Sequence, residues 1–185
     1  HYHFLADLGK DLFGKENDKI RARLRKHGIQ GKLHTRVRAY KRRIDEDPSL
    51  VESLAGIMKE TNPSGCTSLK SAPLVVSYTL VLWALESKKS AQGYGFPFDR
   101  TYLTFYQRLK TLDATIRRLR QRHGLSRKDA APYRAICRDL VDTLEDPLLR
   151  RKTEKMAEKA AVFDQLRQAM RIALPNGKDG LNDHG

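Results

Sequence analysis

Apolar residues recur every three or four positions along almost the whole chain, which is the spacing of one face of an α-helix. One regular stripe precedes Gly124 and consists of Tyr102, Phe105, Leu109, Leu112, Ile116 and Leu119. Another long stripe, opened by Asp146-Pro147, consists of Leu149, Met156, Ala160, Phe163, Leu166 and Met170. The pattern predicts an all-α protein, a multi-helix bundle of about seven to eight helices.

Capping residues and glycines predict where the helices begin and end. The first helix is expected to stop near Gly14, and a second to be capped by Asn17 or Asp18 and to close at Gly28. Further boundaries are expected at three places, namely Asp47-Pro48 followed by a capping Ser49, a capping Ser126 with Pro132 in the first turns, and Pro175-Asn176-Gly177.

Turn-forming residues divide the chain into segments. We expect basic helices over residues 1–60, a loop over 61–72, and a helical core over 73–174 with an aromatic loop at 93–98. Residues 175–185 are expected to be a tail. Both ends look like cuts through a longer protein, so the chain is interpreted as a fragment.

The segment from Val75 to Leu85 is apolar on all sides, which favours a buried helix. Its length is below the roughly 18 apolar residues that suggest a membrane span. We therefore expect no membrane-spanning segment. Cys66 and Cys137 are the only cysteines and lie far apart without the spacing of a zinc site, so a reducing cytoplasm is expected.

The formal net charge is +14 and the pI is about 10.0. Such an excess destabilises the compact state by self-repulsion unless an anionic partner relieves it. Nucleic acid is the leading candidate and an anionic membrane surface the second.

Two groups of basic residues carry much of this charge. The first consists of Arg21, Arg23, Arg25, Lys26, Arg36, Arg38, Lys41, Arg42 and Arg43, and the second of Arg117, Arg118, Arg120, Arg122, Arg127 and Lys128. Asp18 is the only acid between residues 17 and 44, so these cations are expected to lack local partners. Arginine suits bidentate phosphate contacts. The alternative is an ordinary solvated helix face.

Two other features favour ordinary structural roles. The basic group Arg150, Arg151, Lys152, Lys155 and Lys159 is diluted by Glu154 and Glu158, which favours a solvated face. The aromatic side chains Tyr94, Phe96 and Phe98 could stack on unpaired bases. Packing into the core is the commoner role of such residues.

Signals for catalysis are sparse. The chain has no Gly-rich phosphate loop, no serine-histidine-acid set and no paired metal ligands, so no metal site is predicted. Glu86, at the end of the apolar segment, is the one acid placed as a catalytic carboxylate would be. A glutamate that simply reaches solvent at a helix end is the alternative.

The opening segment, His1–Leu12, resembles a stretch of bacterial insertion-sequence transposases of the DDE (RNase H-like) type. The segments Gly93–Arg100, Tyr102–Leu109 and Gly177–Asp183 look like the same group. In that family a Cys-x-x-His motif follows the second catalytic aspartate. His3 would be its histidine, and the cysteine would fall just before residue 1.

This resemblance implies a DNA-transposing enzyme whose carboxylates hold two Mg²⁺ ions. The two aspartates would lie upstream, and the glutamate downstream or at Glu86. The chain would then be a helical insertion that positions DNA and itself holds no cofactor. Its partners would be DNA and the rest of the transposase, in the bacterial cytoplasm at the nucleoid.

Two other classes of function stay open. One is a freestanding helical nucleic-acid-binding protein without catalysis, and the other is a helical scaffold that binds an acidic protein. Whether the chain forms a homo-oligomer is equally open.

Overall fold

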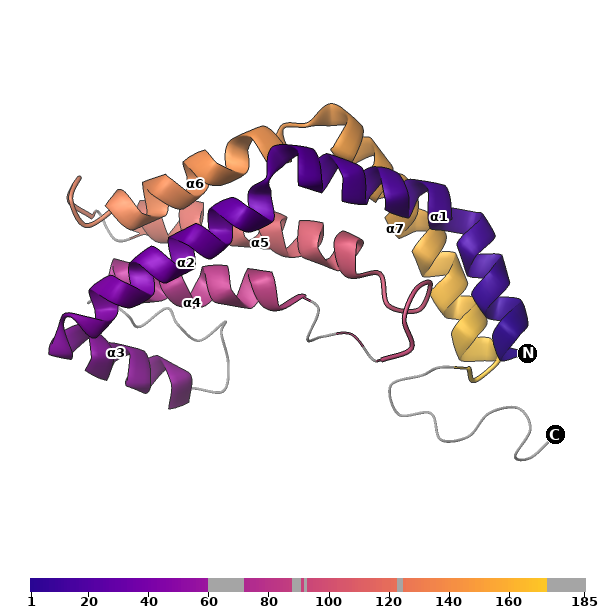
Figure 1. Ribbon diagram of the computed structural model, residues 1–185, viewed down its shortest axis with the longest axis horizontal. Coiled ribbons are helices and arrows are strands. Elements are labelled where there is room, and N and C mark those ends of the chain that lie inside the picture. The colour runs from indigo at the N-terminus through magenta and orange to yellow at the C-terminus, as the bar shows by residue number, and fades with distance from the viewer. Residues whose placement is uncertain (60–71, 88–90, 92, 123–124, 173–185) are drawn as a thin grey trace. The chain divides into compact units, whose positions relative to one another are not determined.

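A computed structural model describes residues 1–59, 72–87, 91, 93–122 and 125–172, without the side chains of Met58, Lys59 and Arg122. This part of the chain contains seven helices and no strand, which confirms the all-α prediction (Figure 1). The helices are α1 (Tyr2–His27), α2 (Ile29–Asp45), α3 (Pro48–Lys59), α4 (Pro73–Leu85), α5 (Thr101–Arg122), α6 (Ala131–Leu144) and α7 (Pro147–Ala169). The predicted loop before Ala72 and the predicted tail lie outside the described residues.

The chain divides into two compact units. Unit 1 comprises residues 1–26, 87–106 and 146–185, and unit 2 comprises residues 27–86 and 107–145. Helix α5 therefore contributes its first turns to unit 1 and the rest of its length to unit 2.

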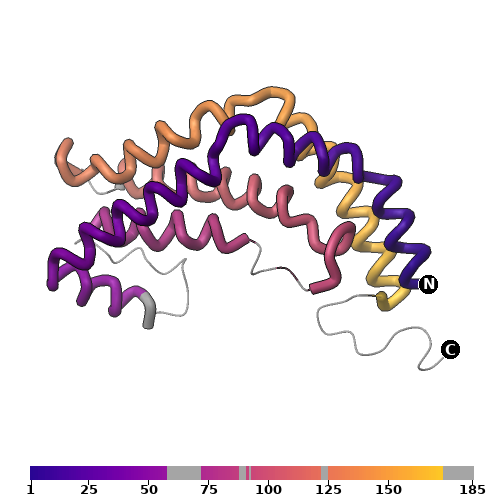
Figure 2. Tube along the Cα trace, viewed as in Figure 1, coloured from indigo at the N-terminus to yellow at the C-terminus, as the bar shows by residue number. Residues whose placement is uncertain are grey.

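Helices α1 and α7 form the body of unit 1 and run antiparallel (Figure 2). Their direction follows from the contacts, because Phe13 meets Phe163 whereas Arg23, further along α1, meets Asp146 at the start of α7. The aromatic loop completes this core. Phe98 is 4% exposed and its ring packs on Phe163, so the packing interpretation of this loop is confirmed for Phe98.

Unit 2 is built around α2, which contacts α3, α4 and α6. Helix α4 is buried over much of its surface, as the apolar sequence predicts, and Val75, Val81 and Ala84 are fully buried. The predicted apolar stripe before Gly124 lies on α5 and is buried as expected, since Leu109, Leu112 and Ile116 are fully buried. Burial of each such side chain stabilises the fold by about 1.5–3 kcal/mol.

The predicted break near Gly14 is wrong, because α1 is one helix of 26 residues. Its buried residues Leu5, Phe13 and Ile20 follow a single helical stripe across Gly14, so a continuous helix buries all of them at once. A glycine inside a helix costs only about 1 kcal/mol relative to alanine. Burial of the stripe exceeds that cost. The predicted end at Gly28 is confirmed, where φ is +59°.

Two of the predicted caps are displaced. Asp47, and not Ser49, caps the start of α3, since its Oδ1 accepts hydrogen bonds from the Ser49 backbone N–H and hydroxyl. Ser126 Oγ accepts from the Asp129 N–H and so caps the turn before α6, which begins only at Ala131. The start of α7 is as predicted.

Gly9 and Gly14 provide a matched test of the α1 packing. A Cβ at Gly9 would lie 2.5 Å from Pro97 Cγ and 2.9 Å from Phe163 Cε2, whereas a Cβ at Gly14 meets nothing within 4 Å. We expect Gly9→Ala to lower the free energy of unfolding by about 1–3 kcal/mol through overpacking. Gly14→Ala should raise it by up to about 1 kcal/mol. Urea denaturation measures both changes, and equal effects would contradict the packing of α1 against the aromatic loop.

Candidate nucleic-acid interface

Two arginines of the predicted phosphate-binding groups are held by acids that lie far away in the sequence. Arg23 contacts Asp146, with Nε 2.7 Å from Oδ2, and the Asp146 side chain is only 1% exposed. Arg36 donates two hydrogen bonds to Asp139 of α6, from Nε to Oδ2 at 2.9 Å and from Nη2 to Oδ1 at 3.1 Å. Neither arginine has an acidic partner nearby in the sequence, but tertiary contacts bring in acids that lie 123 and 103 positions away.

Other cations of the two groups make weaker contacts. Lys41 and Arg42 pair with Asp45 and Glu46 one helical turn ahead, and all four side chains are largely exposed. Exposed pairs of this kind contribute about 0–1 kcal/mol, so they dissociate readily in favour of a phosphate. Arg21 lies over the Tyr102 ring at 5.8 Å.

The remaining side chains of the two groups form no ion pair with any described residue. They are Arg25 and Lys26 in unit 1 and Arg38, Arg43, Arg118, Arg120, Arg127 and Lys128 in unit 2, and all are exposed. The side chain of Arg122 lies outside the described part. Residues 114–128 contain six Lys or Arg and no Asp or Glu. Unit 2 therefore carries a surface with a large excess of unpaired arginine.

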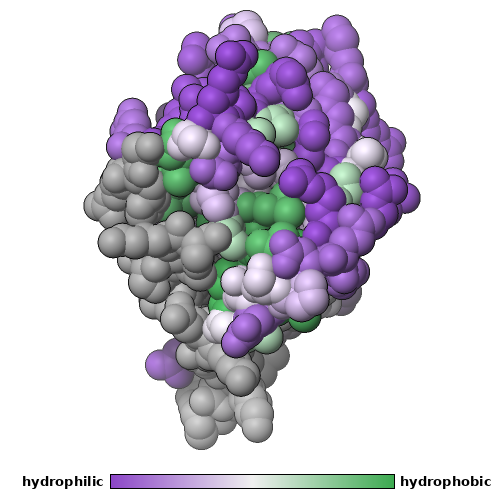
Figure 3. All heavy atoms as spheres, turned by 90° about the vertical axis from the view of Figure 1, so that its left-hand side faces the viewer, coloured by the Kyte–Doolittle hydropathy of each residue, from purple (hydrophilic) through white to green (hydrophobic). Residues whose placement is uncertain are grey.

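The basic parts of α2, α5 and α6 meet at one end of unit 2, on the left in Figure 1. Tyr40 of α2 fixes this arrangement by donating a hydrogen bond to the Pro132 carbonyl in the first turn of α6, at 3.0 Å. Burial raises the pKa of Tyr40 to about 12, so its hydroxyl stays a donor at neutral pH. Figure 3 looks onto this end, where hydrophilic side chains lie above and to the right of a smaller apolar area. We call it the basic end.

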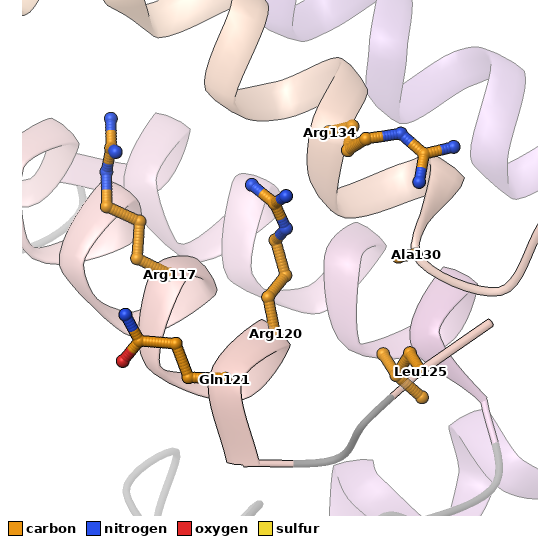
Figure 4. Close-up of a pocket in the computed structure, with 6 residues that line it drawn as sticks. All are labelled: Arg117, Arg120, Gln121, Leu125, Ala130 and Arg134. Carbon is orange, nitrogen blue, oxygen red and sulfur yellow. The ribbon is translucent and has the colours of Figure 1, made fainter. Parts of the chain in front are cut away.

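A pocket of about 370 Å³ opens at the basic end, between the last turns of α5 and the start of α6 (Figure 4). Its lining consists of Arg117, Arg120, Gln121, Leu125, Ala130 and Arg134. In Figure 4, Arg117 and Arg120 extend in the same direction from α5, and Arg134 comes from α6. Arg117 and Arg120 are three positions apart, which places them on one helix face. We call this pocket the arginine pocket.

Two of its arginines are oriented by the protein. Arg117 Nε donates to Asp113 Oδ2 at 2.7 Å, and Arg134 Nη2 donates to the Arg127 carbonyl at 2.5 Å. Each guanidinium has five N–H donors, so most of them stay available. Cys137 lies close by, and burial together with the Asp113 carboxylate raises the pKa of its thiol. At neutral pH the thiol adds no negative charge.

Two lysines of the third basic group, Lys155 and Lys159 on α7, contact α1. Glu16 is 7% exposed, and its Oε1 lies 3.7 Å from Lys155 Nζ and 3.6 Å from Lys159 Nζ. Lys159 also donates to the Leu12 carbonyl. Burial acts to raise the pKa of Glu16, but a backbone hydrogen bond and the neighbouring lysines hold it below the usual value. These two lysines stabilise unit 1.

The two residues considered for catalysis lie apart from any metal-binding group. His3 is exposed in the first turn of α1 with its ring edge-on to Tyr2. Glu86 follows α4 as its C-cap and is half-buried. Among the described residues, no three His, Cys, Asp or Glu side chains are grouped so that they could hold a metal ion.

No protein-family model, curated protein or solved structure matches this chain. Of the helices in the described ranges, none has the length and apolar content needed to cross a membrane.

Sequence reasoning missed Arg134. It lies six positions after Lys128 and beyond Pro132, so it falls outside the uninterrupted basic run. Pro132 indicates that a new helix begins there, but only the tertiary structure places Arg134 beside the end of α5.

Proposed function

We propose that this chain binds double-stranded DNA through its phosphates, using the basic end of unit 2, and that it is the helical DNA-positioning part of a DDE-type transposase. The observation that carries the DNA-binding part is the set of exposed arginines at this end that pair with no acid among the described residues. In an ordinary solvated face, positive and negative side chains are mixed. Here several of the nearby acids are already paired, Asp139 with Arg36, Asp113 with Arg117, Asp45 with Lys41 and Glu46 with Arg42.

Phosphate contacts are favoured over base reading. The exposed cations are arginine and lysine, and the amides nearby are Gln30 and Gln121. Phosphate contacts position a protein on DNA without selecting its sequence. Binding is therefore expected to depend strongly on salt and weakly on base sequence.

The transposase part rests on the resemblance of His1–Leu12 and Gly93–Arg100. Two observations support treating these segments as one structural element. Tyr2 stacks on Phe98 with ring centroids 5.0 Å apart, and its hydroxyl donates a hydrogen bond to the Tyr94 carbonyl at 3.4 Å. The third similar segment, Gly177–Asp183, lies outside the described residues. In the gene, we expect a cysteine codon just before His1 and an aspartate codon upstream; a reading frame without them contradicts this part.

A competition experiment separates DNA from the other anionic partners. Fluorescent duplex DNA would be displaced by unlabelled duplex, by poly-glutamate or by phosphatidylserine vesicles, at equal total charge and about 0.1 M salt. DNA carries one charge per about 1.7 Å of its axis, so it releases more counterions than an extended polypeptide with one charge per about 3.5 Å. We expect unlabelled duplex to compete at least tenfold better than poly-glutamate. Equal competition would instead favour the acidic-protein scaffold, and superior competition by vesicles a membrane surface.

A further inference from the structure

The arginine pocket differs from the other cations of the basic end because three arginines from two helices line one pocket. Arg118, Arg127 and Lys128 are single exposed side chains, whereas Arg117, Arg120 and Arg134 line one hollow from two helices (Figure 4). Like charges brought together repel, so such a grouping is unfavourable until an anion enters. The three charged side chains of its lining also distinguish this pocket from the mainly apolar sites that bind most small molecules.

The acids near the pocket do not neutralise it. Asp113 Oδ2 is bonded to Arg117, and its other oxygen, Oδ1, is buried without a hydrogen-bond partner among the described residues. Asp129, in the turn before α6, accepts a hydrogen bond from the Ser126 hydroxyl at 2.6 Å. One partly buried and one bonded carboxylate thus face three guanidinium groups, and a net positive charge remains.

The start of α6 adds to this positive field. Ala130, which lines the pocket, is the N-cap of α6, and the helix start has neither a side-chain cap nor an acid in its first turn. The N-terminal end of a helix carries a partial positive charge. It therefore strengthens the attraction that the three arginines exert on an anion.

We propose that the arginine pocket is a discrete phosphate site that holds one phosphodiester group of the bound DNA between Arg120 and Arg134. The inference rests on the proposed DNA binding and deepens it, because it assigns to Arg134 a role that the basic run of the sequence does not contain. Guanidinium groups bind phosphate oxygens in a bidentate manner, which gives geometric as well as electrostatic selectivity. The site fixes the position of the DNA backbone relative to α5 and α6.

Two charge-matched double variants test the site in the full chain. Arg120→Gln with Arg134→Gln removes two charges from the pocket. Lys110→Gln with Arg138→Gln removes two charges from exposed positions of the same two helices that do not line it. Arg120→Lys with Arg134→Lys keeps the charge and removes the bidentate geometry. Circular dichroism first establishes that all variants keep the helical content of the wild type.

Isothermal titration with inorganic phosphate, at constant ionic strength, is the first readout. We expect saturable binding by the wild type, at least a tenfold loss in the pocket variant, and a change within about twofold in the control variant, because hydrogen bonds between charged groups are stronger than those between neutral groups. The lysine variant should lose part of the affinity. No saturable binding by the wild type, or equal losses in the two Gln variants, overturns the site.

Titration of the same proteins with duplex DNA separates this inference from the proposed function. DNA binding that is weakened equally by both Gln variants leaves the DNA proposal standing and overturns the phosphate site. Phosphate binding that depends on the pocket, in a protein that does not bind DNA, supports the site as an anion site and contradicts the proposed function. The expected result is that the pocket variant loses more DNA affinity than the control.

Discussion

Asp146→Ala is expected to lower the free energy of unfolding by about 2–4 kcal/mol, because two interactions are lost together. Asp146 Oδ1 accepts hydrogen bonds from the Leu148 and Leu149 N–H groups at 3.0 and 3.1 Å and so caps α7. Its Oδ2 holds Arg23 of α1. The side chain is almost fully buried, so water replaces neither contact while the unit stays folded. Chemical denaturation measures the loss.

Asp142→Ala is the matched control for this prediction. The Asp142 side chain is 68% exposed and lies 3.9 Å from Lys32, so its removal should change stability by no more than about 0.5 kcal/mol. Asp146→Asn should fall between the two, since the amide oxygen still caps the helix but the charge is lost. If Asp146→Ala is as mild as Asp142→Ala, the ion pair with Arg23 is not a structural element.

A large loss of stability in Asp146→Ala would also indicate that Arg23, its ion-pair partner, has a structural role. Arg23 holds a buried helix cap, so its substitution is expected to lower the stability of unit 1 and not to remove a phosphate contact. Arg36, bonded to Asp139, falls in the same class in unit 2. Both residues are therefore unsuitable for testing phosphate contacts, although they belong to the basic groups of the sequence.

The second large effect is expected for DNA affinity. The triple variant Arg38→Gln, Arg42→Gln and Arg118→Gln removes three exposed cations of unit 2. Each lost phosphate contact should lower affinity about tenfold at about 0.1 M salt and reduce the salt slope by about one unit. The loss should be the same for duplexes of unrelated sequence. Fluorescence anisotropy at two salt concentrations measures affinity and slope together.

The control for this triple variant must remove three positive charges elsewhere on the protein without disturbing its structure. Lys152, Lys155 and Lys159 are poor choices, because Lys155 and Lys159 lie beside the buried Glu16. Lys15, Lys19 and Arg151 are exposed and form no ion pair with a described residue, so their change to Gln gives a charge-matched control. Equal weakening by the two triples would mean that the protein attracts DNA only through its total charge.

The sequence predicts much of the helical fold because the apolar stripes are long and regular. Those of α5 and α7 span many turns, and the helical spacing places them on one face of a helix. The helix ends were harder to place. Gly14 suggests a helix end because the cost of a helical glycine, about 1 kcal/mol, follows from the local sequence, whereas the burial of Phe13 and Ile20 that offsets it depends on tertiary packing.

The candidate site was only partly predictable for the same reason. Local charge counts identify Arg118, Arg127 and Lys128, whose surroundings in the chain contain few acids. They do not distinguish Arg36 from Arg38, because the partner of Arg36 lies more than 100 positions away on α6. Arg134 joins Arg120 only because α5 and α6 are adjacent in the fold.

The salt dependence of wild-type DNA binding tests the central claim most directly. Six exposed cations of unit 2, Arg38, Arg43, Arg118, Arg120, Arg127 and Lys128, form no ion pair with described residues. If each contacts one phosphate, a plot of log K against log salt concentration has a slope of about −5 for any duplex sequence. A slope near zero, or no binding at about 0.05 M salt, would contradict DNA binding through phosphates.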